Sequence, residues 1–166
     1  MGNVYGYQCA KCSNYVWFST GVGFLFPFCY EKAIDEIKAG KWGEEYQEFF
    51  EAYKNAATDV EEGVYLCEYC GEVFNEMNRG MYISKDENQE VLPSEIRWCV
   101  AMPQIGKEYV TSYDLAKDYY LYKKEIHNCP KCGKPTKQIK EDDIEMITIC
   151  RKCNQKMKLV DLESWD

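Results

Sequence analysis

Eight of the ten cysteines in this chain stand in four C-x-x-C pairs, and this spacing constrains the fold more than any other feature. Two residues between thiolates form a tight turn, here called a knuckle, that points both sulfurs at one metal ion. Two knuckles complete a tetrahedral shell, and zinc is the metal that closed four-cysteine shells commonly hold. Four knuckles therefore predict two metal sites. The pairs are Cys9 and Cys12, Cys67 and Cys70, Cys129 and Cys132, and Cys150 and Cys153.

The spacing between knuckles predicts which of them share an ion. Only 17 residues separate Cys132 from Cys150, which falls within the gap of about 15 to 20 residues found in zinc sites built from two such pairs. The first two knuckles are 54 residues apart, too far for a bare hairpin but suitable for a ribbon with an inserted subdomain. A pairing exchanged between the halves is the alternative. We expect one site from Cys9, Cys12, Cys67 and Cys70, and the other from Cys129, Cys132, Cys150 and Cys153.

The residues around the knuckles resemble a known superfamily. The sequence His127-Asn-Cys129-Pro-Lys-Cys132-Gly133, followed by Cys150-Arg-Lys-Cys153, is similar to a zinc ribbon of the rubredoxin-like type. The sequence Tyr7-Gln-Cys9-Ala-Lys-Cys12, with Val64-Tyr-Leu-Cys67-Glu-Tyr-Cys70-Gly71, is similar to a second one. The whole chain also resembles small bacterial proteins with two zinc ribbons, through a Gly-Phe-Leu-Phe-Pro segment and a terminal Trp-Asp. The resemblance implies a metal and a fold, but no activity.

Other uses of C-x-x-C pairs fit this sequence less well. Disulfides need an oxidising compartment, and a redox dithiol would be a single pair set before a helix. Met1 to Tyr7 has no positive charge and no long apolar stretch, so we expect no secretory signal and a cytoplasmic location. Iron is the closer competitor, because rubredoxin uses the same four-cysteine shell. We expect two Zn²⁺ per chain, with iron as the alternative metal.

The fold class expected is a small, metal-stabilised α+β protein with two four-cysteine ribbons, the first carrying a helical insertion. Residues 1–76 would form the N-terminal ribbon with a two-helix insertion at about 28–57, residues 77–125 a connection, and residues 126–166 the C-terminal ribbon. β-branched and aromatic runs predict strands, and apolar spacing with glycine breaks predicts helices. The strands expected are 4–8, 15–19, 64–66, 72–74, 96–102, 136–139, 146–149 and 156–160, and the helices 28–40, 42–53 and 111–125. An exposed loop is expected at 85–90, within the polar stretch 75–95.

The second predicted helix is strongly amphipathic. Its apolar side should pack on the first ribbon, and its glutamates should face water. A di-iron site is not expected, because such sites need Glu-x-x-His pairs and the single histidine, His127, has no glutamate three residues before it. The apolar side consists of Trp42, Tyr46, Phe49, Phe50 and Tyr53, and the glutamates are Glu44, Glu45, Glu48 and Glu51.

The charge of the chain is uneven. The net charge is -8, which argues against a general affinity for nucleic acid or anionic membranes, yet residues 129–158 carry 8 basic and 4 acidic side chains. These cations could contact phosphates, or could simply offset the negative charge of a metal with four thiolates. The uncharged run 13–30 contains glycine and proline and predicts strand and turn instead of a membrane span. The candidate nucleic-acid contacts are Lys131, Lys134, Arg151 and Lys152.

No set of residues pairs a nucleophile with a base. His127 is expected beside the second ribbon, and Cys29 and Cys99 are most simply small buried residues. We therefore expect a non-enzymatic, cytoplasmic binding or adaptor protein with two structural zinc sites. The 14 tyrosines, with 4 Trp and 7 Phe, favour a protein partner, because aromatic rings are enriched in interfaces. The alternatives are a nucleic-acid-associated ribbon protein and a rubredoxin-like iron electron carrier.

Overall fold

The computed structural model describes residues 2–22, 26–85 and 118–165, and it divides the chain into two compact units. The first unit consists of residues 1–21, 62–77 and 126–166, and the second of residues 22–61 and 78–125. Neither unit is continuous in sequence. The chain passes between them close to the predicted boundaries after 76 and before 126, but the ends of the chain belong to one unit, unlike the three sequential segments expected.

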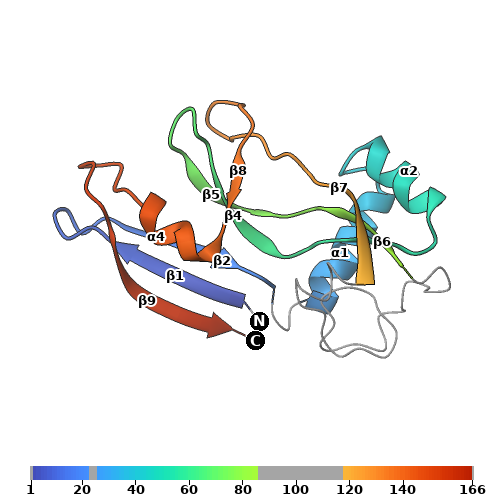
Figure 1. The fold of residues 1–166 in the computed structure, drawn as a ribbon, viewed down its shortest axis with the longest axis horizontal. Helices are drawn as coiled ribbons and strands as arrows, with labels where there is room; N and C mark the ends of the chain where they lie inside the picture. The colour runs from blue at the N-terminus through green and yellow to red at the C-terminus, as the bar shows by residue number, and fades with distance from the viewer. Residues whose placement is uncertain (1, 23–25, 86–117, 166) are drawn as a thin grey trace. The chain divides into compact units, whose positions relative to one another are not determined.

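The first sheet of the first unit joins both ends of the chain. Strand β1 (Gly2–Gln8) lies between β2 (Tyr15–Thr20) and β9 (Lys158–Trp165), and both neighbours are antiparallel to it (Figure 1). The turn between β1 and β2 holds the first knuckle, and β9 follows the fourth knuckle. The closing strand expected in the C-terminal ribbon therefore pairs with the N-terminal strand.

The second sheet repeats this arrangement. Strand β4 (Glu62–Leu66) lies between β5 (Val73–Met77) and β8 (Lys137–Ile139) (Figure 1). The turn between β4 and β5 holds the second knuckle, and β8 follows the third. The predicted hairpin of 136–139 with 146–149 is wrong, because β8 pairs with β4 and the chain then forms a 3₁₀ turn (Glu141–Asp143) and helix α4 (Ile144–Ile147). Ile144, which is fully buried, fixes this helix to the core.

The two sheets of the first unit share one hydrophobic core. Because aliphatic residues are few, rings and cysteines fill much of it. Gly21 and Glu62 exchange two backbone hydrogen bonds of 3.0 and 3.1 Å, and the Asn75 carboxamide bonds the backbone N–H and C=O of Ser19. These contacts join β2 to β4 and β5. The buried core residues are Tyr7, Cys9, Phe18, Val64, Ile144, Cys150 and Met157.

The second unit has its own core, formed by two helices and a third antiparallel sheet. Helices α1 (Phe26–Lys38) and α2 (Glu44–Ala52) match the two predicted helices, and α1 ends just before Gly40, whose φ is 73°. The sheet has the order β3 (Ala56–Thr58), β6 (Met81–Ser84) and β7 (Tyr119–Lys123). None of the described helices has the length and apolar character needed to cross a membrane.

The amphipathic pattern of α2 is confirmed. Tyr46 and Phe49 are buried with Ile37, Ala56 and Met81, so the apolar side of the helix contributes to the core of the second unit. Trp42 and Phe50 are partly buried, and Tyr53 is 37% exposed. The glutamates Glu44, Glu45, Glu48 and Glu51 are all exposed, as expected.

One further prediction about the connecting region is wrong. Tyr119–Lys123 is a strand paired with β6, not the end of a helix over 111–125. Aromatic residues are enriched in strands, and this run fits a half-covered sheet surface better than it fits the helix that the apolar spacing predicted. The polar stretch 75–95 contributes the end of β5 and all of β6, and the loop expected at 85–90 lies, apart from Lys85, outside the described residues. The predicted strand 96–102, the start of the predicted helix, and Cys99 lie outside the described residues.

Candidate metal centres

All four knuckles share one backbone geometry. In the third knuckle, the N–H of Cys129 donates to the carbonyl of Lys134, and the N–H of Gly133 donates back to the carbonyl of Cys129, both at 2.8 Å. The first, second and fourth knuckles make the same two bonds at 2.8 to 2.9 Å. These bonds close a tight turn that holds both sulfurs on one side, as the C-x-x-C spacing predicts.

The residue after the second cysteine of each knuckle has a left-handed backbone. Its φ is 54° at Ser13, 71° at Gly71, 68° at Gly133 and 54° at Asn154. Glycine adopts this conformation without strain, and asparagine tolerates it better than most residues. The sequence signal for this position is therefore the Gly or Asn that follows three of the four pairs.

A substitution at this position should change stability through the backbone alone. A Cβ at Gly133 would meet nothing within 4 Å, so Gly133→Ala should lower the free energy of unfolding by about 1 kcal/mol, the cost of a left-handed residue with a side chain. Ser13→Gly removes the same cost and should leave stability unchanged or slightly higher. Urea unfolding of the zinc-loaded variants tests this, and equal losses in both would contradict it.

The eight cysteines form two groups of four. Within each group the sulfur atoms lie within 4.8 Å of one another, close enough for a single metal ion. Since the second group is nested within the first along the sequence, we call them the outer and the inner cysteine group. The outer group consists of Cys9, Cys12, Cys150 and Cys153, and the inner group of Cys67, Cys70, Cys129 and Cys132.

The predicted pairing of knuckles is therefore wrong, and the exchanged pairing is the one the structure has. The first knuckle meets the fourth because β1 pairs with β9, and the second meets the third because β4 pairs with β8. The short spacing between Cys132 and Cys150 does not produce a local ribbon, since the residues between them lead from β8 into α4.

The sulfur spacing fits four-coordinate metal sites. In the outer group, Sγ of Cys9 lies 3.3 Å from that of Cys153, and Sγ of Cys12 lies 3.5 Å from that of Cys150. In the inner group the corresponding distances are 3.5 Å for Cys67 with Cys132 and 3.6 Å for Cys70 with Cys129. A tetrahedral ion with metal–sulfur bonds of about 2.3 Å places its ligands about 3.8 Å apart, whereas a disulfide bond is about 2.05 Å long. None of these eight cysteines is in a disulfide bond.

The protein environment differs between the two cysteines of a knuckle. The first of each pair is buried: Cys9, Cys67, Cys129 and Cys150. The second is half-buried or exposed.

The pKa values of the thiols in the outer group also differ. A hydrogen bond from the backbone of Cys12 is the main cause that lowers the pKa of the Cys9 thiol to about 6. The neighbouring Cys9 sulfur, with burial, raises the pKa of Cys153 to about 12. The outer group is thus suited to lose its first proton near neutral pH, as a metal ligand must.

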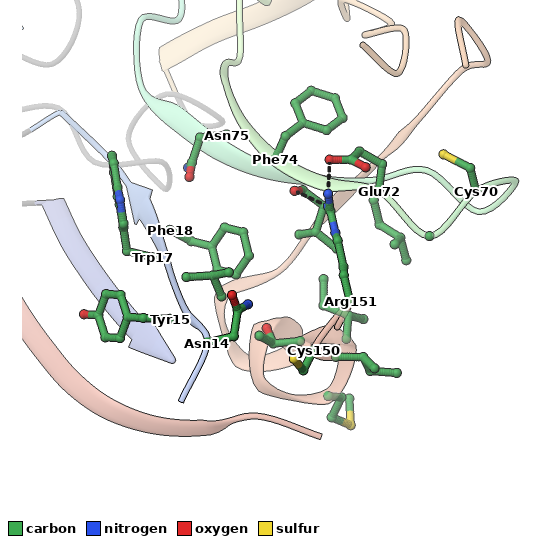
Figure 2. Close-up of a pocket in the computed structure, with 18 of the residues that line it drawn as sticks. Asn14, Tyr15, Trp17, Phe18, Cys70, Glu72, Phe74, Asn75, Cys150 and Arg151 are labelled. Carbon is green, nitrogen blue, oxygen red and sulfur yellow. Dashed lines mark hydrogen bonds and ion pairs between the residues drawn. The ribbon is translucent and has the colours of Figure 1, made fainter. Parts of the chain in front are cut away.

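A charged cluster links the two groups through Glu72, a residue that the knuckle pattern does not mark (Figure 2). Arg151, in the fourth knuckle, lies with Nη1 2.6 Å from Oε1 of Glu72, beside the second knuckle, and its Nη2 donates to the carbonyl of Val73 at 3.3 Å. Nζ of Lys131, in the third knuckle, lies 4.0 Å from Oε2 of Glu72. Glu72 is only 15% exposed, so this cluster joins knuckles of the outer and the inner group at a partly desolvated carboxylate.

The candidate phosphate contacts lie on the surface but are not all free. Lys131, Lys134, Arg151 and Lys152 are exposed, yet two of them pair with Glu72. Nζ of Lys134 lies 5.9 Å from the ring centre of Tyr69, whose side chain is 75% exposed at the tip of the second knuckle.

The remaining candidate residues lie outside both cysteine groups. His127 is buried, and its ring centre lies 4.4 Å from that of Tyr65. Cys29 lies on α1 and is half-buried. Neither belongs to a metal-binding cluster among the residues that the structure describes.

Comparison of the chain with protein-family models, with curated proteins and with solved structures gave no match.

Proposed function

We propose that this protein holds one structural zinc ion in each cysteine group and acts, without catalysis, as a binding module for another protein. The observation that carries the proposal is the closure of eight thiols into two four-sulfur groups by four equivalent knuckles. Four cysteine ligands fill a tetrahedral shell, and such closed shells are typical of structural zinc, whereas catalytic zinc keeps an open position.

The sheet around each group supports a zinc-ribbon assignment. Each group sits at one end of a three-stranded antiparallel sheet, in which a hairpin carries one knuckle and the third strand follows the other. The two ribbons are nested: the inner one is built from segments near 62–77 and 128–139, and the outer one from both ends of the chain. The segments of each ribbon are far apart in sequence, so a shared metal ion would supply much of the free energy that holds them together.

A binding role is supported by the surface of the first unit. Trp17 is 61% exposed, Tyr69 is 75% exposed and Ile149 is 52% exposed. The aromatic side chains among them are of the kind enriched where proteins meet, because such rings bury much area with little loss of rotamer entropy. A role in binding nucleic acid is the second candidate, favoured by Lys134 beside the Tyr69 ring. The pairing of Arg151 and Lys131 with Glu72 weakens it.

Metal content tests the first half of the proposal. Protein made in zinc-replete medium should contain two zinc ions per chain by elemental analysis, and Cys29→Ser, outside both groups, should contain the same number. One ion per chain would contradict the two closed sites. A red protein with visible absorption after growth with iron would favour the electron carrier, and salt-sensitive retention on heparin would favour the nucleic-acid role.

A further inference from the structure

The first unit contains a groove between its two sheets. The groove has a volume of about 830 Å³, and its walls are β2, β5 and the segment from Met146 to Asn154 (Figure 2). In the sheet orders β2-β1-β9 and β5-β4-β8, both β2 and β5 are edge strands. Two strand edges therefore border one groove.

The edge of β2 has hydrogen-bonding groups directed away from β1. The carbonyl of Asn14 points to β1, where it accepts from Cys9, whereas Ser19 bonds Asn75 and Gly21 bonds Glu62 on the opposite side. The direction of N–H and C=O alternates along a strand. Tyr15 and Trp17 lie four and two residues before Ser19, so their backbone N–H and C=O groups also point away from β1.

Only the far end of this edge is covered. Asn75 and Glu62 satisfy Ser19 and Gly21, but the described residues supply no partner for the outward backbone groups of Tyr15 and Trp17. An uncovered edge is a template for pairing with another strand, and proteins commonly protect such edges.

The chemistry of the groove restricts what can occupy it. Its lining includes Trp17, Met146 and Ile149, which are 61%, 64% and 52% exposed. The charged side chains that line it are Arg151 and Glu72, and they neutralise one another at 2.6 Å. A nucleic acid would need several unpaired cations. A helix has its backbone groups satisfied internally and would leave those of Tyr15 and Trp17 unpaired.

We propose that the groove binds an extended, uncharged and predominantly apolar peptide segment of a partner protein, which adds to β2 as a further strand. The outward groups of Tyr15 and Trp17 would bond the peptide backbone. Because side chains alternate along a strand, one set of peptide side chains would lie on the face of Trp17, and the other on the face of Phe18, toward Met146 and Ile149. This is the strand-addition mode of peptide recognition. It rests on the proposed function as a protein-binding module and specifies its surface and the form of its ligand.

The probe is a displayed library of random short peptides, selected on the zinc-loaded, full-length protein. Enriched peptides should be predominantly apolar, with apolar residues at consecutive positions and few charges. N-methylation of alternate peptide nitrogens tests the backbone contacts. Methylation of the nitrogens that face β2 should weaken binding about tenfold or more. Methylation of the nitrogens that face away from β2 should have little effect. Amide resonances of Tyr15 and Trp17 should shift when the peptide is added.

Variants of the protein test the same contact from the other side. Trp17→Pro removes an outward N–H that takes no part in the β1–β2 ladder, a position where an edge strand tolerates proline. It should weaken peptide binding more than Trp17→Thr, which removes the ring but keeps the N–H. Tyr120→Thr, in β7, removes an aromatic side chain that is 62% exposed and lies outside the groove, and it should not change binding. Each variant should keep two zinc ions.

The outcomes separate this inference from the proposed function. Enriched peptides that bind equally well to Trp17→Pro, or that bind as helices, would overturn the groove assignment and leave a protein-binding role standing. A library that yields no binder, with tight binding of RNA instead, would overturn both. Self-association through β2, shown by a dimer that Trp17→Pro dissociates, would also overturn the partner assignment.

Discussion

Double substitution of Cys9 and Cys150 with serine is expected to remove one metal ion per chain, whereas double substitution of Cys9 and Cys67 is expected to remove two. Cys9 and Cys150 both belong to the outer group, so the replacement of Cys150 removes a ligand from a site that the loss of Cys9 has already disrupted. Cys67 belongs to the inner group, so its loss opens a second site. The metal-to-protein ratio by elemental analysis measures the difference. The sequential pairing suggested by spacing predicts the reverse result.

Single cysteine substitutions should show how much structure each ion supports. Structural zinc in small domains contributes about 10 to 16 kcal/mol of apparent binding free energy, which is also folding free energy. Cys9→Ser should therefore unfold the β1–β2 knuckle and release β9, while hydrogen exchange in β4 and β5 stays slower. Cys29→Ser is the matched control, because Cys29 lies outside both groups and should keep both ions. Complete unfolding of the first unit by Cys9→Ser would show that the two ribbons do not fold separately.

The contrast between knuckles and their pairing shows what a single sequence can specify. A knuckle depends on six consecutive residues, so the spacing of Cys129 and Cys132 was sufficient to predict it. The pairing depends on which strands meet, and strands such as β1 and β9 are separated by most of the chain. A gap of 17 residues suits a hairpin, but the burial of Ile144 in the shared core favours a helix there. Long-range packing thus overrides local spacing.

Residues whose role depends on a neighbouring strand were the hardest to predict. Glu72 and Asn75 carry the contacts that join the two ribbons, yet they match no motif, because their role depends on the partner strand. The run Tyr119 to Tyr122 has apolar residues at both helical and strand spacing. Pairing of β7 with β6 decides in favour of the strand.

The helical pattern of residues 42–53 allowed a better prediction, because amphipathicity is local. It identified which side of α2 is buried, although not the surface that the helix covers, which is formed by Ala56 and Met81. Whether each side chain of α2 is buried or exposed could therefore be predicted, but the residues that it contacts could not.

Replacement of Phe49 with alanine is expected to lower the free energy of unfolding of the second unit by about 3 to 5 kcal/mol. Phe49 is 4% exposed, and its ring centre lies 4.8 Å from that of Tyr122 and 5.4 Å from that of Tyr53. The change leaves a cavity in a small core that also contains Tyr46 and Met81. Urea unfolding followed by hydrogen exchange in α2 and β6 would measure the loss.

Glu48→Ala is the matched control, since Glu48 is exposed one residue away on the same helix and its replacement should change stability by no more than about 0.5 kcal/mol. Both variants should keep two zinc ions with unchanged rates of release to a chelator, because α2 belongs to the core of the second unit. Equal stability losses would show that the buried side of α2 is assigned wrongly. Faster zinc release from Phe49→Ala alone would indicate that the helix supports a cysteine group, as the amphipathic pattern first suggested.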